Sequence, residues 1–195
     1  MRIDNRRCEE IKRIIVEFLE DYEAVDYPLD LFRVFTRIGL PLIRYSDLPE
    51  GIKAILVSVY EDAFAITQHS PKGLQAIVFY NDMQPETRMR FSLAHELAHI
   101  ILEHRGETPQ LEREANYFAA YILAPHPLIM LWCKPDSMEI MERFHVGFEC
   151  ARAANDSTRK RVQFGGSKLT DYESTLLQIV AGGENYEFAY CCFSQ

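Results

Sequence analysis

The feature that most constrains the fold of this chain is a change in hydrophobic period, which occurs twice. Helical spacing dominates the first 39 residues, and a first amphipathic helix is predicted over residues 5–22 from Ile11, Ile14, Ile15, Phe18 and Leu19. Between residues 40 and 80 the apolar residues form short runs rich in β-branched and aromatic types, separated by turn formers. From Pro85 the helical period returns. This succession predicts an α+β fold with a small sheet.

Within this outline, individual elements can be assigned. A short second helix is expected to begin at Pro28 and to be closed by Gly39. Three or four strands of a mostly antiparallel sheet are expected at residues 40–45, 53–60, 63–68 and 74–80. Helices are predicted at residues 85–105, 109–124, 137–144, 148–162 and 170–181.

Composition limits the class of protein. The 195 residues include 21 Lys and Arg against 29 Asp and Glu, so the formal net charge is −8. This balance disfavours a protein that coats nucleic acid or anionic membranes through bulk charge. The N-terminal stretch is charged and no apolar run could span a bilayer. No CxxC pair occurs among the five cysteines, which are Cys8, Cys133, Cys150, Cys191 and Cys192. We therefore expect a cytoplasmic protein with incidental thiols and no membrane partner.

The segment His95-Glu96-Leu97-Ala98-His99 is an HExxH motif inside the predicted helix 85–105. Residues i and i+4 share one helix face, so both imidazoles can meet one cation, with Glu96 beside it. Two such histidines can equally be surface residues or hydrogen-bonded core residues. However, apolar side chains surround this helix almost completely, so we expect it to be buried and its histidines to form a cleft floor.

A third metal ligand is expected from the following helix. Thr108 and Pro109 fit the N-cap and first position of that helix, and Gly106 fits a C′ cap just after His104 and Arg105 at the end of the preceding one. The loop between the helices would then be short, which makes an αα-hairpin.

In that hairpin, Glu112 lies at nearly the depth of His99. Glu114 is the competitor; because it lies about 200° around the helix from Glu112, only one of them can face the histidines. The apolar residues of this helix favour Glu112 as the ligand and place Glu114 on the solvent side. Asn116, one turn beyond Glu112, is expected as a hydrogen-bond partner for the histidines.

Two segments of the sequence closely resemble the signature of a known protein family. RMRFSLAHELAHIILEH (residues 88–104) and EREANYFAAYILAP (residues 112–125) resemble the signature of the ImmA/IrrE family of bacterial and phage metallo-endopeptidases. VFYND (residues 78–82) and YPLDLF (residues 27–32) are similar to that family as well, so the resemblance covers about residues 1–145.

The resemblance implies a zincin-like fold with the HExxH helix at its centre. It implies a metallopeptidase domain at residues 1–135 and a helical C-terminal extension at residues 136–195. His95, His99 and Glu112 would bind Zn²⁺, and Glu96 would be the catalytic carboxylate that takes a proton from water. The implied partner is a protein substrate, a helix-turn-helix transcriptional repressor encoded nearby, whose cleavage derepresses mobile-element or stress genes.

The sequence leaves some details of such a site open. Tyr121, His126, His145 and Arg90 are all candidates for the group that stabilises the oxyanion. An extended substrate could pair with an exposed sheet edge, for which residues 74–80 are the candidate strand.

Two rival functions belong to other classes. Residues 137–162 have the cadence of a helix-turn-helix that ends in Arg159, Lys160 and Arg161, which would make a DNA-binding regulator. The acidic balance and the scarcity of base-reading side chains favour packed helices instead, so we expect no direct nucleic-acid binding. The other rival is a non-proteolytic metal-binding regulator or toxin/antitoxin-type protein; a purely structural metal site would not need Glu96.

Overall fold

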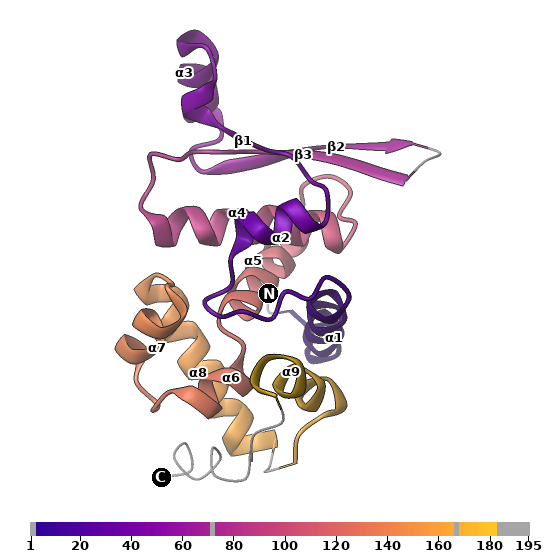
Figure 1. The fold of residues 1–195 in the computed structure, drawn as a ribbon, viewed down its shortest axis with the longest axis vertical. Coiled ribbons are helices and arrows are strands. Elements are labelled where there is room, and N and C mark those ends of the chain that lie inside the picture. Colours follow the sequence, from indigo (N-terminus) through magenta and orange to yellow (C-terminus); the bar gives the residue numbers. More distant parts are fainter. Residues whose placement is uncertain (1–2, 71–72, 166–167, 183–195) are drawn as a thin grey trace. The chain divides into compact units, whose positions relative to one another are not determined.

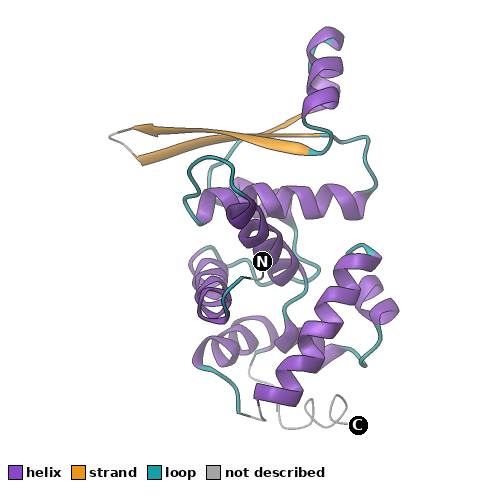
Figure 2. Cartoon of the chain, turned by 180° about the vertical axis from the view of Figure 1, so that it is seen from behind, coloured by secondary structure: helices purple, strands orange, loops and turns teal. Residues whose placement is uncertain are grey.

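The computed structural model describes residues 3–70, 73–165 and 168–182 (Figure 1). The chain divides into two compact units. Asp30–Ala119 forms the sheet unit, and Met1–Leu29 with Ala120–Gln195 forms the helical unit. Strands are confined to the sheet unit among the described residues, and helices occur in both, which confirms the predicted α+β class (Figure 2). The predicted domain boundary at residue 135 stays a prediction.

The sheet unit contains β1 (Leu42–Arg44), β2 (Ala63–Ser70) and β3 (Gly73–Tyr80), in the order β1-β3-β2. β2 and β3 form an antiparallel hairpin with a register from Ala63↔Tyr80 to Ser70↔Gly73, while β1 pairs with β3 in parallel over three residues. Alternate residues of β3 (Ala76, Val78 and Tyr80) are buried. α4 (Glu86–Ile101) contacts both long strands and lies across one face of the sheet (Figure 1).

Local capping decides where the helix α2 (Leu31–Arg37) begins and ends. The Asp30 side chain accepts a hydrogen bond from the Arg33 N–H at 3.1 Å, so the helix begins after this N-cap and not at Pro28. Gly39 has a φ of +69° and follows the helix as predicted, since glycine adopts this left-handed conformation without strain.

The predicted strand at residues 53–60 is wrong, because the structure forms α3 (Glu50–Val59) there. Pro49 precedes the helix and Glu50 lies in its first turn, where a carboxylate complements the helix dipole. Every residue of α3 is at least partly exposed, and Ile55 retains 64 % of its accessible surface. The helix projects from the sheet on the side away from α4 (Figure 1). Among the described residues no strand pairs with this segment, so its β-branched residues do not determine its conformation.

α4 carries the buried core of the sheet unit on Leu93, Ala94, Leu97, Ala98 and Ile100. It ends four residues earlier than predicted. Leu102 is its C-cap, and Glu103, not Gly106, takes the left-handed conformation at C′ with a φ of +52°. The next helix, α5 (Pro109–Leu123), begins at Pro109 as predicted. The connection between the two helices therefore runs from residue 102 to 108 and is longer than the sequence pattern suggests.

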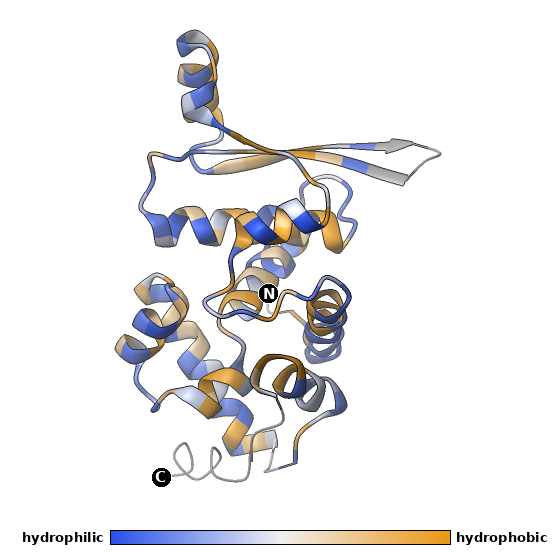
Figure 3. Ribbon diagram, viewed as in Figure 1, coloured by the Kyte–Doolittle hydropathy of each residue, from blue (hydrophilic) through white to orange (hydrophobic). Residues whose placement is uncertain are grey.

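Among its described residues, the helical unit contains four helices near predicted positions, α1 (Asn5–Asp21), α7 (Ser137–Phe144), α8 (Phe148–Gly165) and α9 (Asp171–Ala181). It also contains α6 (His126–Trp132), which the sequence analysis did not predict. α1 packs on α9, while α8 packs on both α6 and α7. Hydrophobic and hydrophilic residues alternate along α1, and its apolar face is buried through Ile11, Ile15 and Leu19 (Figure 3). None of the described helices is both long and apolar enough to cross a bilayer.

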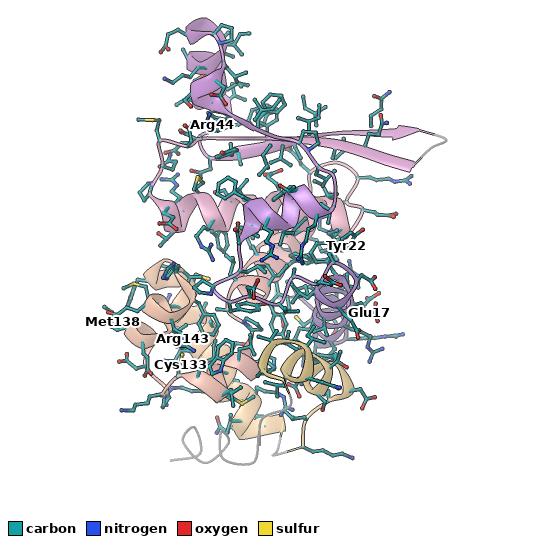
Figure 4. All side chains as sticks on the ribbon, in the orientation of Figure 1. Glu17, Tyr22, Arg44, Cys133, Met138 and Arg143 are labelled. Atoms are coloured by element: carbon teal, nitrogen blue, oxygen red, sulfur yellow. The ribbon has the colours of Figure 1, made fainter. Side chains whose placement is uncertain are left out.

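The described cysteines carry no disulfide, as expected. Cys8, Cys133 and Cys150 are free thiols, and Cys191 and Cys192 lie outside the described residues. Burial raises the pKa of Cys133 to about 12 and that of Cys150 to about 11, so both thiols stay protonated at neutral pH. Cys133 and Arg143 are labelled in Figure 4; the Arg143 guanidinium lies 5.0 Å from the centre of the Trp132 ring.

Candidate metal centre

His95, His99 and Glu112 come together in the sheet unit. One ligand atom from each lies within 4.8 Å of the others, and all three residues are partly exposed. The Nε2 atoms of the two histidines are 3.0 Å apart. One carboxylate oxygen of Glu112 is 3.2 Å from His95 Nε2, and the other is 3.3 Å from His99 Nε2.

The spacing of these atoms fits a small divalent cation. Ligands bound at 2.0–2.1 Å with tetrahedral angles lie about 3.3–3.4 Å from one another. The Nε2–Nε2 separation of 3.0 Å is close to that edge length, and so is the distance from each Nε2 atom to the Glu112 oxygen nearest it, 3.2 Å for His95 and 3.3 Å for His99. Two imidazoles and one carboxylate are also the donor set of zinc hydrolases, which leave a fourth position open. The residues present therefore fit a metal ion.

Two helix ends set this geometry. His95 and His99 lie one turn apart on α4. Glu112 lies in the first turn of α5, whose start is fixed by Thr108: its Oγ1 accepts a hydrogen bond from the Leu111 N–H at 3.3 Å, and its carbonyl accepts one from the Glu112 N–H. The hairpin places the Glu112 carboxylate opposite the two imidazoles.

Asn116 lies one turn beyond Glu112 and contacts His95, as the sequence predicts. Its Oδ1 is 3.2 Å from His95 Nδ1. An amide oxygen can only accept, so Nδ1 of His95 donates and the proton is on that nitrogen. The neutral tautomer with its proton on Nδ1 has its lone pair on Nε2, the atom that faces Glu112 and His99, and this is the form that binds a metal.

Glu96 lies beside this cluster and is held by the sheet. Its carboxylate accepts a hydrogen bond from the backbone N–H of Ala65 in β2. Burial, and then the negative charge of Glu112, raise the pKa of Glu96 to about 7. Burial also lowers the pKa of His99 to about 4, with a smaller effect from His95, so the His99 imidazole is neutral at pH 7.

These residues line a cleft of about 910 Å³ within the sheet unit. One wall is β2, whose residues Ala63, Phe64, Ala65 and Thr67 border the cleft. Within the described part of the chain β2 is an edge strand, since its one partner there is β3. The predicted edge strand, residues 74–80, is wrong for residues 78–80, which lie between β1 and β2; the pairing with β1 does not extend to residues 74–77.

Comparison with known protein families gives one match. The model of the Peptidase_M78 family, described as the IrrE N-terminal-like domain, matches residues 52–154, which is more than half of the chain. The chain belongs to the IrrE N-terminal-like domain family. No curated protein and no solved structure matches it. The match includes all of α4 and α5, and thus His95, His99 and Glu112.

Membership of this family, together with the His–His–Glu cluster, indicates a metal-binding protein of metallopeptidase type. It also agrees with the α+β architecture of the described residues, in which a small sheet packs on the HExxH helix.

In this member of the family the predicted orientation of Glu114 is wrong. Its side chain is buried, with 4 % of its surface exposed, and does not lie on the solvent side. Gln110 Nε2 donates to its Oε1 at 3.1 Å, and its Oε2 is 3.7 Å from Nε2 of His104. A helical wheel that counts only apolar residues assigns Glu114 to solvent. The actual packing buries it against polar neighbours.

His104, which contacts both Glu114 and His99, has no functional role in the sequence analysis. There it only marks the end of the predicted helix. Its side chain is 2 % exposed and its Nδ1 is 3.1 Å from Nδ1 of His99. The signal in the sequence is a third histidine five residues after His99.

The predicted oxyanion donors fall in different places. Arg90 is a buried residue of α4, and burial lowers its pKa. Tyr121 and His126 lie together in the helical unit with ring centres 5.2 Å apart, and His126 bonds Glu173 at 2.8 Å. His145 is the left-handed C-cap of α7. The assignment of an oxyanion donor stays a prediction.

Proposed function

We propose that this chain is a zinc-dependent endopeptidase whose metal ligands are His95, His99 and Glu112 and whose catalytic carboxylate is Glu96. The observation that carries the proposal is the cluster of ligand atoms in a cleft that Glu96 also lines: the two Nε2 atoms are 3.0 Å apart, and each lies 3.2 or 3.3 Å from a different oxygen of the Glu112 carboxylate. Membership of a metallopeptidase family supports the same reaction.

When bound, a zinc ion supplies Lewis-acid chemistry: it lowers the pKa of water and polarises a peptide carbonyl. The protein supplies the proton transfers. Glu96 accepts a proton from the attacking water and delivers it to the leaving nitrogen. The N–H of Ala65 fixes the carboxylate for both transfers. Asn116 holds His95 so that its Nε2 faces the metal position.

The peptide substrate is proposed to bind as an extra strand along β2. One edge of this strand has no partner strand in the described ranges, and Ala63, Ala65 and Thr67 border the cleft. Backbone hydrogen bonds to an edge strand hold a peptide in extended form, largely independently of its sequence. One of the N–H groups of this strand, that of Ala65, already holds Glu96, so the scissile bond would lie close to the general base.

The proposed substrate is a transcriptional repressor with a helix-turn-helix domain, encoded near this protein, and its cleavage would derepress mobile-element or stress genes. The support for this class is the resemblance of residues 88–104 and 112–125 to the ImmA/IrrE signature. The proposed location is the cytoplasm, where such a repressor acts.

Direct DNA binding by residues 137–162 is less well supported. Arg161 makes two hydrogen bonds to the buried Glu173, at 2.7 and 2.8 Å, and Arg159 donates to the Pro135 carbonyl at 2.8 Å. Two of the three cations of the basic cluster are thus engaged within the helical unit, which leaves fewer charges for a DNA backbone.

The test is to incubate the zinc-loaded protein with repressor proteins encoded beside its gene and to map the products by mass spectrometry. We expect one defined cut in one of them. Glu96→Gln is the matched control because it keeps the size of the side chain and all metal ligands. It should bind zinc as the unchanged protein does and lose cleavage by about 10²–10⁴-fold. If Glu96→Gln cleaved the repressor as fast as the unchanged protein does, Glu96 would not be the catalytic carboxylate.

A peptide library, presented to the same preparation, separates the two levels of the proposal. Cleavage of library peptides without cleavage of any repressor would contradict the substrate class and keep the endopeptidase. Absence of zinc binding would contradict both.

A further inference from the structure

The arrangement of protons on His99 and His104 follows from their geometry. The two Nδ1 atoms are 3.1 Å apart, so one donates a hydrogen bond and the other accepts it. If Nε2 of His99 binds a metal, it carries no proton, and the proton of His99 is on Nδ1. His99 therefore donates to Nδ1 of His104, and His104 must carry its own proton on Nε2.

That second proton faces a buried carboxylate. Nε2 of His104 is 3.7 Å from Oε2 of Glu114, and both side chains are nearly inaccessible to solvent. A carboxyl oxygen at this distance favours the His104 tautomer that places an N–H, and not a lone pair, at Nε2. Gln110 donates to the other oxygen of Glu114 at 3.1 Å and so helps to fix the carboxylate.

The end of α4 explains why His104 lies where it does. Glu103 turns the chain in the left-handed conformation, the His104 N–H bonds the His99 carbonyl at 2.9 Å, and the Glu103 N–H bonds the Ile100 carbonyl at 3.2 Å. This is a Schellman motif, which brings the side chain at C″ onto the side chain at C3. Here C″ is His104 and C3 is His99. Their rings meet edge to face with centres 5.0 Å apart.

We propose that His104 and Glu114 are positioning residues of the metal centre, which orient His99 through its Nδ1–H and fix the tautomer that presents Nε2 to the ion. The inference rests on the proposed metal site. It makes the two histidine ligands unequal: His95 is held by the amide of Asn116, and His99 by a buried imidazole backed by a carboxylate. Such outer partners fix ligand orientation in metalloproteins.

The test compares two variants of equal size. His104→Leu removes the acceptor for His99 Nδ1–H, whereas His104→Asn retains one, because the Asn Oδ1 occupies nearly the position of the His Nδ1. Zinc affinity is measured by competition with a chromophoric chelator. The fold of each metal-free variant is checked by circular dichroism and urea unfolding, and the cobalt-loaded forms are compared by their visible absorption.

We expect His104→Leu to lose about 10–100-fold in zinc affinity and to change the cobalt spectrum, while remaining folded without metal. His104→Asn should bind within about threefold of the unchanged protein, since it keeps the hydrogen bond on which orientation depends. Glu114→Gln, which removes the charge but not the volume, should show a smaller loss than His104→Leu. Glu103→Gln is the control for Glu114→Gln, because it makes the same change in charge at an exposed residue beside His104. It should leave zinc affinity unchanged.

Two results would overturn the inference while leaving the proposed function intact. One is a folded His104→Leu variant that binds zinc as tightly as the unchanged protein. The other is an equal loss in His104→Leu and His104→Asn, since packing and not the hydrogen bond would then be the cause. A failure of the unchanged protein to bind zinc would instead contradict the proposed function itself.

Discussion

Each unit of the chain buries a histidine–glutamate pair, and the two pairs are built differently. In the helical unit, His126 Nε2 bonds Glu173 at 2.8 Å, and Glu173 also accepts from Arg161 and from the Thr170 N–H. In the sheet unit, His104 Nε2 lies 3.7 Å from Glu114, which accepts a hydrogen bond from Gln110 at 3.1 Å.

The difference shows how the same two residue types serve different ends. Glu173 accepts hydrogen bonds from α6, α8 and the start of α9, so its carboxylate holds those helices together. The looser pair in the sheet unit turns its remaining ring nitrogen toward His99. We expect substitutions at the first pair to change stability, and substitutions around the second to change metal binding.

The largest expected effect is a loss of zinc affinity caused by a substitution in the cleft of the sheet unit. Glu112→Ala removes a ligand, so zinc affinity should fall by more than the roughly 10–100-fold that loss of an outer partner costs. Glu112 is 43 % exposed, so the metal-free unfolding free energy should change by no more than about 0.5 kcal/mol. Chelator competition and urea unfolding measure the two quantities. If Glu112→Ala lost unfolding free energy to the same extent as zinc-binding free energy, Glu112 would be as important for stability as Glu173, contrary to the prediction.

Glu173→Ala should destabilise the protein by about 3–5 kcal/mol, because it leaves Arg161 and His126 buried without their partner. Urea unfolding of the metal-free protein measures this. Glu149→Ala is the matched control in the same unit: its ion pair with Arg152 is exposed, so its removal should cost no more than about 1 kcal/mol. Similar costs for the two variants would show that the buried network is not what stabilises the unit.

Acid should weaken the helical unit through the same pair. Burial alone raises the pKa of Glu173, but hydrogen bonds from His126 and Arg161 outweigh it and hold that pKa far below its ordinary value of 4.5. Burial lowers the pKa of His126, an effect to which the Lys12 and Arg161 cations add and which Glu173 opposes. Both groups bind protons more weakly when folded. Their stabilisation is therefore present at neutral pH and is lost as the pH falls, first below about 6.5 and then below about 4.5.

Unfolding free energies at a series of pH values check this sign. Glu173→Gln should flatten the fall below pH 4.5, because the group that binds protons in the unfolded state is gone. An unchanged slope in this variant would assign the acid sensitivity to other carboxylates.

The smallest effect concerns the turn that places His104. Glu103 has a φ of +52°, where a side chain is strained, whereas the equivalent turn after α2 uses Gly39. Glu103→Gly should raise the unfolding free energy by about 1 kcal/mol and leave zinc affinity unchanged, since the backbone bonds to His99 and Ile100 remain. A loss of stability would mean that the Glu103 side chain, and not its backbone, matters at this turn.

Local signals were sufficient for much of the fold. Thr108 and Pro109 mark the start of α5 by capping alone, and the HExxH spacing puts His95 and His99 on one face of α4. The antiparallel pairing of residues 63–68 with 74–80 follows from two β-rich runs with a short turn between them.

The sequence predictions are wrong where tertiary contacts, and not local preference, decide the structure. Residues 53–60 have strand composition, but Glu50 at the helix start and the absence of any pairing strand among the described residues allow α3 to form. Glu114 is buried beside His104, and His104 follows a left-handed Glu103, a conformation that no propensity predicts. Such polar burial cannot be derived from the spacing of apolar residues.

The central claim is that one ion binds between His95, His99 and Glu112. Anomalous diffraction from crystals grown with zinc, recorded on both sides of the zinc absorption edge, tests it most directly. We predict a peak about 2.0–2.2 Å from both Nε2 atoms and from a Glu112 oxygen. A well-ordered cleft with no peak there, or with the zinc bound elsewhere, would contradict the account.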